Sequence, residues 1–305
     1  MKNYQDVKMI ETPSVNLGND LLNSLFSTQK GVEWGTLIFL TGTSGAGKTT
    51  LCKKLQSLIS DHVSLFYSRE MMSHLVKKQT LRLDITHNNA FIADSKDYPH
   101  FNQLMEVVES RGDVKILMID SVQRVANDFI KDGMTREAAM RHIYGVLTEW
   151  KDRTNGVVIL IGQLTKDGDY EGASFLKFDA DAHVHMVFDE KKNTRTIETT
   201  KNRMGKLGKL YYEILDSSET IKFFTEKEFE LKDKNIKFDD YLQKVVSDFI
   251  SAIDKNSVGY GAFIEEFDQS SVNIYNEHLK GDLSASEYFG NTITKLHELL
   301  LKYAL

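Results

Sequence analysis

The sequence contains very little cysteine and proline. Cys52 is the single cysteine among the 305 residues, and Pro13 and Pro99 are the two prolines. One cysteine excludes a disulfide framework and a zinc site built from several cysteines. Two prolines argue against long disordered linkers. Cys52 itself falls in a predicted helix, where we interpret it as a small packed residue.

Long apolar runs are also absent. No stretch of about 18 apolar residues occurs, and the first residues contain no apolar signal core, so the sequence predicts neither a membrane span nor secretion. We therefore expect a cytoplasmic protein without a membrane partner.

The composition is that of a globular protein, with 41% hydrophobic and 27% charged residues. The length predicts about two domains. The net charge of −6 argues against a simple, basic nucleic-acid-binding domain. Residues 225–305 hold 15 acidic and 9 basic side chains, whereas the rest of the chain holds 29 of each. The acidity therefore belongs to the C-terminal part, and a local basic channel in the first part remains compatible with the sequence.

Alternating strands and helices predict βαβ units and a mostly parallel sheet. The expected strands are residues 35–41, 63–67, 114–119 and 157–162, and the expected helices are residues 49–59, 101–110 and 135–152. Three closely spaced strands predict an antiparallel extension at the sheet edge: residues 183–189, 194–200 and 209–214. After residue 225 the pattern becomes helical. It contains an amphipathic stretch (residues 238–253) and a final helix that Ser284 and Glu287 would begin as a capping box.

The predicted fold class is therefore α/β, with a mostly parallel central sheet, antiparallel edge strands and a C-terminal helical appendage. The expected organisation is an N-terminal lead-in segment (1–33), a core (34–224) and an acidic helical appendage (225–305).

Residues 42–49, GTSGAGKT, match the phosphate-binding pattern G-x-x-x-x-G-K-[ST] at every fixed position, between a predicted strand and a predicted helix. Glycines let the backbone wrap a phosphate, and its N–H groups point inward at the helix N-terminus. Lys48 would reach the β- and γ-phosphates of ATP, and Thr49 would place its hydroxyl on Mg²⁺. The alternative is a glycine-rich turn without a ligand. The residues expected to bind the nucleotide are Gly42, Thr43, Ser44, Gly45, Ala46, Gly47, Lys48, Thr49 and Thr50.

Two carboxylates follow predicted strands. Asp120 ends the apolar strand VKILMI, where we expect it beside the P-loop strand and bound to Mg²⁺, directly or through water. The alternative is a turn or capping residue. Glu70 ends the strand after the P-loop helix and would face the nucleotide crevice. It could orient and deprotonate the attacking water, or only favour the N-terminus of the next helix.

An amide and two cations complete the candidate catalytic set. Gln163 ends the strand VVILIG, where it could sense the γ-phosphate or simply be a solvated strand end. Lys201 and Arg203 share one face of an extended segment, a geometry suited to clamping phosphate oxygens. The alternative is a solvated basic strand end. His183 and His185 also share a strand face, but no third metal ligand is evident, so we interpret them as partly exposed strand histidines.

These motifs, taken in order, resemble a RecA-superfamily ATPase, and most closely the bacterial RadA/Sms family of DNA repair proteins. The P-loop GTSGAGKTTL, with its approach from Leu17 to Gly35, resembles that family's entry segment. The segment YSRE resembles its V-S/T-G-E, and ILMIDSVQ resembles its VIDS-I-Q. The segment IGQLTKDG resembles G-H-V-T-K-D/E-G, and KNRMG resembles the hallmark K-N-R-F-G. The resemblance covers about residues 10–224.

The resemblance implies a RecA-like P-loop core that hydrolyses ATP with Mg²⁺ at the subunit interfaces of a ring or filament. A homo-oligomer, such as a hexameric ring, acting on single-stranded DNA in recombination, repair or replication is implied. Lys201 and Arg203 would then act in trans on the neighbour's γ-phosphate. The loops after Asp120 (124–135) and after Gln163 (166–179) would face the central channel. Arg124, Lys166 and Lys177 would contact DNA there.

The chain also departs from that family. One cysteine leaves no four-cysteine zinc module, and the acidic helical residues stand in place of the family's Lon-like domain. Met204 replaces the family's Phe, and Gln163 replaces its His and agrees better with DnaB-type helicases. We therefore expect a divergent version, for which phage and host origin both stay open and whose C-terminal helices could bind a recombination or replication protein. Two alternatives stay open: a KaiC-like regulatory ATPase that does not move DNA, and a P-loop small-molecule kinase.

Overall fold

The computed structural model describes residues 14–26, 31–80, 85, 87–164, 174–215, 221–230, 232, 247, 260–279 and 285–303. The chain divides into two compact units, residues 1–226 and 227–305. The first unit carries every candidate site residue named above.

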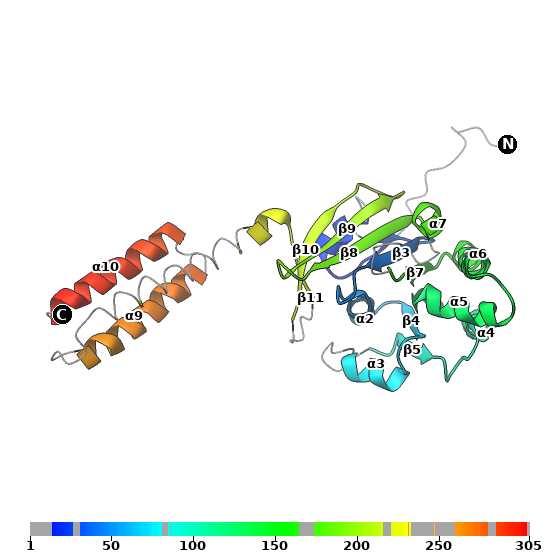
Figure 1. Ribbon diagram of the computed structural model, residues 1–305, viewed down its shortest axis with the longest axis horizontal. Coiled ribbons are helices and arrows are strands. Elements are labelled where there is room, and N and C mark those ends of the chain that lie inside the picture. The colour runs from blue at the N-terminus through cyan, green and yellow to red at the C-terminus, as the bar shows by residue number, and fades with distance from the viewer. Residues whose placement is uncertain are drawn as a thin grey trace. The chain divides into compact units, whose positions relative to one another are not determined.

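A nine-stranded sheet forms the centre of the first unit, in the order β11-β10-β9-β8-β3-β7-β6-β4-β5 (Figure 1). The strands are β3 (Leu37–Gly42), β4 (Val63–Ser68), β5 (Ala90–Asp94), β6 (Val114–Asp120), β7 (Val157–Ile161), β8 (Ala182–Asp189), β9 (Thr194–Asn202), β10 (Lys209–Ile214) and β11 (Ile221–Phe224). Strands β8, β3, β7, β6, β4 and β5 are parallel, and β9, β10 and β11 extend the sheet antiparallel. The predicted α/β sheet with antiparallel edge strands is confirmed.

Helices cover both faces of this sheet, as buried parallel strands require. The helices of the first unit are α1 (Asp20–Ser24), α2 (Lys48–Leu58), α3 (Ser73–Thr80), α4 (Phe101–Arg111), α5 (Val122–Lys131), α6 (Arg136–Thr154) and α7 (Ser174–Asp179). Side chains of α1, α2 and α3 enter one apolar core, and side chains of α4 to α7 enter the core on the other face. The predicted helices after the P-loop, at residues 101–110 and from Thr135 onward, thus appear as α2, α4 and α6.

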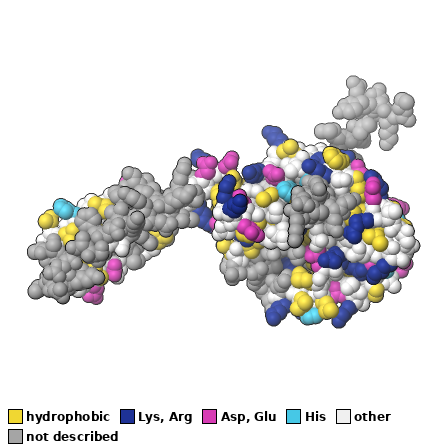
Figure 2. Space-filling model, viewed as in Figure 1, with side chains coloured by type: hydrophobic (Ala, Val, Ile, Leu, Met, Phe, Trp, Pro, Cys, Tyr) yellow, Lys and Arg dark blue, Asp and Glu magenta, His cyan; other side chains and the backbone are white. Residues whose placement is uncertain are grey.

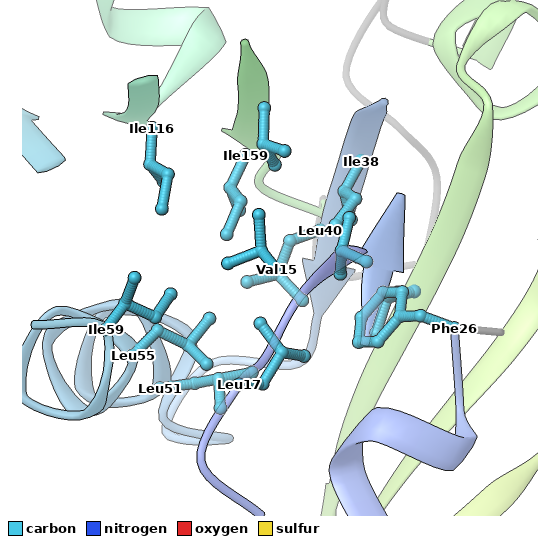
Figure 3. Close-up of a pocket in the computed structure, with 13 residues that line it drawn as sticks. Val15, Leu17, Phe26, Ile38, Leu40, Leu51, Leu55, Ile59, Ile116 and Ile159 are labelled. Atoms are coloured by element: carbon cyan, nitrogen blue, oxygen red, sulfur yellow. The ribbon is translucent and has the colours of Figure 1, made fainter. Parts of the chain in front are cut away.

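The segment before the P-loop strand packs into the first of these cores. Its short strands β1 (Ser14–Val15) and β2 (Val32–Glu33) pair antiparallel. Val15, Leu17, Leu22 and Leu25 are at most 3% exposed. A cavity of about 20 Å³, lined only by apolar side chains, lies between this segment, α2 and the sheet (Figure 3). Apolar walls offer a water molecule no hydrogen bond, so we expect this cavity to be dry.

The structure corrects one expectation about the residues after Asp120. Residues 124–135 were expected to be a channel loop, but residues 122–131 form the helix α5. The reason is an apolar stripe at helical spacing, because Val122, Val125, Ala126 and Phe129 are buried against the sheet. Strand β5 and helix α3 had not been predicted either.

The second unit is helical in its described part. Helices α9 (Tyr260–Leu279) and α10 (Ala285–Tyr303) pack through Phe263, Phe267, Leu296 and Leu299. Helix α10 covers the predicted final helix, whereas α9 had not been predicted. The amphipathic stretch 238–253 and Ser284 of the expected capping box lie outside the described residues, apart from residue 247. Within the described parts of the chain, no helix is long and apolar enough to cross a membrane.

Candidate nucleotide site

The P-loop turns between the carboxyl end of β3 and the first turn of α2. Gly42 and Gly47 have φ angles of 156° and 93°, which favour glycine. A Cβ atom at Gly42 would lie 2.1 Å from the carbonyl oxygen of Met186 on β8. The neighbouring strand also fixes the turn, because the N–H of Thr43 donates to that same oxygen at 3.0 Å. Backbone freedom and close packing thus explain both glycines.

Lys48 is folded back over this turn. Its Nζ donates to the carbonyl oxygens of Gly42 at 2.8 Å and Thr43 at 3.1 Å. Burial lowers the pKa of Lys48, and the nearby charges of Asp120 and Glu70 partly oppose that shift. An ammonium group with few solvent contacts, at the mouth of a helix N-terminus, is suited to a phosphate oxygen.

Thr49 in the first turn of α2 and Asp120 at the end of β6 are in contact, although the P-loop strand β3 and β6 are not neighbours in the sheet. Asp120 was expected beside the P-loop strand, but β7 lies between β3 and β6 in the sheet. The Thr49 hydroxyl nevertheless donates to Asp120 Oδ2 at 2.6 Å. The first turn of helix α2, which follows the P-loop, makes this contact, and β3 itself does not.

The buried carboxyl group of Asp120 has a raised pKa, which suits a position next to a bound cation. Burial raises its pKa to about 6, the Thr49 hydrogen bond opposes this, and the Glu70 charge adds to it. A positive ion nearby would further favour the carboxylate form of this residue, which is 3% exposed. Among the described residues, no three His, Cys, Asp or Glu side chains cluster as a metal cage. One carboxylate and one hydroxyl are the partial donor set that Mg²⁺ uses when phosphates and water complete its shell.

Glu70 and Gln163 lie side by side at the same sheet edge, where the Gln163 amide donates to the Glu70 carboxylate. The backbone of Gln163 is held in turn by Gln123 on α5. Gln123 Nε2 donates to the Gln163 carbonyl oxygen at 2.9 Å, and the Gln163 N–H donates to Gln123 Oε1 at 3.0 Å. Gln123 is 3% exposed and was not among the predicted site residues. The signal was in the sequence, as the last residue of ILMIDSVQ.

Lys201 and Arg203 lie at the edge of the sheet formed by the amino ends of β3 and β8, opposite the edge that carries the P-loop. Arg203 pairs with Asp181 at 3.1 Å, and Asp181 accepts from the N–H of Leu37, the first residue of β3. Lys201 Nζ donates to the carbonyl oxygens of Ala180, at 2.6 Å, and Phe178. Burial lowers the pKa of Lys201, and Arg203 adds to this shift. In its own chain, the pair therefore fixes the turn between α7 and β8.

His185 is partly exposed on β8, as expected, whereas His183 differs from expectation. His183 is fully buried rather than partly exposed, because β8 lies between β9 and β3. Its Nε2 lies 2.8 Å from Thr41 Oγ1, its Nδ1 contacts Thr200 Oγ1, and His185 Nδ1 lies 3.0 Å from the same Thr41 oxygen. Burial lowers the pKa of His183 to about 4, so the ring is neutral at pH 7.

The predicted DNA contacts occupy different settings. Arg124 is exposed on α5, and Lys177 is half-buried on α7. Lys166 lies outside the described residues.

The strand order, the glycine-rich turn after β3 and the paired Thr49 and Asp120 define a P-loop core of the RecA type. A KaiC-like protein of Pyrococcus horikoshii has a similar fold. Its TM-score is 0.53 at 19% identity, over 66% of this chain and 97% of that protein. A family model for an AAA domain matches residues 33–165.

The chain is also similar in sequence to curated DNA repair proteins named RadA. The DNA repair protein RadA of Rickettsia bellii is 25% identical over 186 residues, which are 59% of this chain and 40% of the relative. The RadA protein of Escherichia coli is 24% identical over 211 residues, 69% of this chain and 45% of the relative. The chain thus spans about two fifths of the length of the curated relatives it matches. Together these similarities support a RecA-superfamily P-loop ATPase related to RadA.

Proposed function

We propose that the protein is a RadA-like ATPase that binds ATP with Mg²⁺, assembles with copies of itself and is stimulated by single-stranded DNA in recombination, repair or replication. In this proposal the P-loop residues 42–50 bind the nucleotide, and Thr49 and Asp120 hold Mg²⁺. Bound Mg²⁺ would neutralise charge on the β- and γ-phosphates. Lys166 and Lys177, with Arg124, are the proposed DNA contacts.

The observation that carries the proposal is the separation of two cationic groups that both suit phosphate. Lys48 lies at the carboxyl end of β3, whereas Arg203 is tied through Asp181 to Leu37 at its amino end. Five residue steps of an extended strand separate Leu37 from Gly42, which is about 17 Å. This separation supports a role for Arg203 at the nucleotide of a neighbouring copy and not at that of its own chain. Its side chain is 54% exposed, as contact with a neighbouring copy would require.

The remaining residues take complementary roles. Glu70 would orient and deprotonate the water that attacks the γ-phosphate. Gln163, which contacts Glu70, would transmit the presence of that phosphate to the loop that follows it. Arg203 and Lys201 of the neighbour would stabilise charge that develops on the transferring phosphoryl group.

A mixing experiment tests the trans arrangement. Lys48→Ala and Arg203→Ala proteins should each lose ATP hydrolysis, the second while still binding ATP as a monomer. In a one-to-one mixture, about a quarter of head-to-tail interfaces pair an intact P-loop with an intact Arg203, so hydrolysis should return in part. A mixture of Lys48→Ala with Glu70→Gln is the matched control, because both defects lie on the same side of the interface and must not complement. Normal turnover by Arg203→Ala alone, or no recovery in the first mixture, contradicts the proposal.

The proposed stimulation by single-stranded DNA is tested by measuring steady-state ATP hydrolysis with and without that DNA at two salt concentrations. A several-fold stimulation that fades with salt is expected, because phosphate contacts release counterions. Hydrolysis that ignores DNA would instead favour the KaiC-like regulatory alternative.

A further inference from the structure

An open hollow of about 360 Å³ lies at the carboxyl edge of the sheet, apart from the P-loop. It is lined by Arg69, Ser95, Arg124, Asn127, Ile130 and Lys131. Arg69 and Ser95 directly follow β4 and β5, and the other four residues belong to α5. Figure 2 shows several Lys and Arg side chains on the part of the core where Figure 1 places α3, α4 and α5.

One cation of the hollow is held rigidly. The Arg69 side chain is 10% exposed and pairs with Asp128. Its Nη1 donates to the carbonyl oxygen of Pro99 at 2.8 Å and to the Tyr67 hydroxyl at 3.1 Å. A guanidinium fixed in this way loses little conformational entropy when it meets an anion.

The other polar groups of the hollow have nothing to bind in the described structure. Arg124, Asn127 and Lys131 recur at helical spacing, so they lie on one face of α5. Within the described residues, no hydrogen bond or ion pair involves their side chains, and Arg124 and Lys131 are exposed. Asp128 offsets the charge of Arg69, so two positive charges remain uncompensated around the hollow.

We propose that this hollow is a second phosphate-binding site, distinct from the P-loop. Guanidinium, ammonium and amide donors around an open concavity match the oxygen acceptors of a phosphate, and Ile130 is the single apolar residue among those named above as lining it. The phosphate can come from the backbone of single-stranded nucleic acid or from a free nucleotide. The first source rests on the proposed function, and the second does not.

The position of the hollow gives such a ligand a route to the hydrolysis site. Arg69 directly precedes Glu70, and its backbone N–H donates to the carbonyl oxygen of Asp120 at 2.7 Å. Arg69 is thus linked by the chain to Glu70 and by a backbone hydrogen bond to Asp120. A phosphate bound to its side chain would therefore contact a residue that is joined to both of these carboxylates. Arg69 is a positioning residue in this inference, and binding in the hollow should raise the rate of hydrolysis more than the affinity for ATP.

The test compares two double variants of the full chain. Arg124→Ala/Lys131→Ala removes both uncompensated charges, and Lys209→Ala/Lys222→Ala removes two lysines from β10 and β11, at the other end of the sheet order. Binding of a fluorescent oligothymidylate is measured against salt concentration by anisotropy. The slope of log affinity against log salt should become shallower by about 1.4 in the first variant, because each single-strand phosphate contact contributes about 0.7. The control should keep the wild-type slope.

A second arm distinguishes the free nucleotide. Lys48→Ala removes phosphate binding at the P-loop, so any remaining binding of labelled ATP reports another site. If that binding disappears when Arg124→Ala/Lys131→Ala is added, the hollow takes a free nucleotide. Urea unfolding of the Arg124→Ala/Lys131→Ala protein, followed by the fluorescence of Trp34 and Trp150 in the first unit, should match wild type, which shows that the variant is folded.

Two outcomes overturn the inference. An unchanged salt slope together with no Arg124- and Lys131-dependent nucleotide binding eliminates the site. The variant Arg124→Lys/Lys131→Arg keeps both positive charges. A salt slope equal to that of wild type in this variant supports the inferred site, and a slope as shallow as that of Arg124→Ala/Lys131→Ala contradicts it. If wild-type protein binds no oligonucleotide at all, the proposed DNA function fails, and the nucleotide arm alone decides the hollow.

Discussion

The buried imidazole of His183 makes the core sensitive to acid. In the unfolded chain a histidine takes up a proton near pH 6.5. In the folded protein the pKa of His183 is about 4, because burial removes the charged form from water and His185, Lys177 and Lys201 oppose a further positive charge. Its folded pKa is depressed, so its contribution to stability is full above pH 6.5 and is lost as the pH falls from about 6.5 to about 4.

The magnitude follows from the size of this shift. Each pKa unit corresponds to about 1.4 kcal/mol, so the full loss is about 3 kcal/mol, of which about 2 kcal/mol falls between pH 7 and pH 5. Asp120 acts in the opposite direction, because its pKa is raised to about 6 and its protonation below that pH favours the folded state. The wild-type pH profile alone therefore does not isolate His183.

The comparison is between wild type and His183→Gln, whose amide can still hydrogen bond to Thr41 and Thr200. Urea unfolding is followed at pH 7 and pH 5 by tryptophan fluorescence, which reports the first unit because Trp34 and Trp150 both belong to it. Wild type should lose about 2 kcal/mol more than the variant over this range. His74→Gln, at an exposed position on α3, is the matched control and should keep the wild-type pH slope. Equal slopes for wild type and His183→Gln would refute the reasoning.

Three other substitutions test parts of the core. Gly42→Ala should abolish high-affinity nucleotide binding in an ATP titration, because its new methyl group would lie 2.1 Å from the Met186 carbonyl oxygen; wild-type affinity would contradict this geometry. Leu22→Ala should lower the free energy of unfolding in urea by about 2–5 kcal/mol, since Leu22 is 1% exposed, and a loss below about 1 kcal/mol would show that the lead-in segment packs only loosely. Gln123→Leu should reduce kcat for ATP hydrolysis without changing the ATP Kd, because it releases the backbone of Gln163, and Gln123→Glu, which keeps one acceptor for the Gln163 N–H, should lose less.

The parts of the structure that depend on local pattern could be predicted. The P-loop has fixed spacing and lies between a strand and a helix, so its turn and the start of α2 at Lys48 follow from the sequence. Apolar runs that end in a polar residue located β6 and β7 in the same way. Asp120 was expected at a strand end for this reason, and it lies at the last position of β6.

The order of the strands in the sheet could not be predicted from the sequence, because strand pairing depends on contacts between segments that are distant in the chain. Nothing in the sequence around Asp120 shows that β7 separates β6 from β3. The burial of His183 has the same origin: alternation places His183 and His185 on one face, but only the neighbours of β8 decide that His183 is inaccessible. Residues 122–131 show a different limit, since their helical apolar spacing was present and the resemblance to a channel loop prevailed over it.

The separation of Lys48 and Arg203 at opposite ends of β3 also constrains stoichiometry. In a pair related by a twofold axis every contact is made in both directions, so two antiparallel copies could place each Arg203 on the other P-loop, and such a pair is already a closed assembly. A head-to-tail row places each Arg203 on the next P-loop but leaves one P-loop at its end without a partner arginine. Only closure gives every copy a complete site. The turnover rate per chain should therefore rise with the length of an open assembly and become independent of it once the assembly closes.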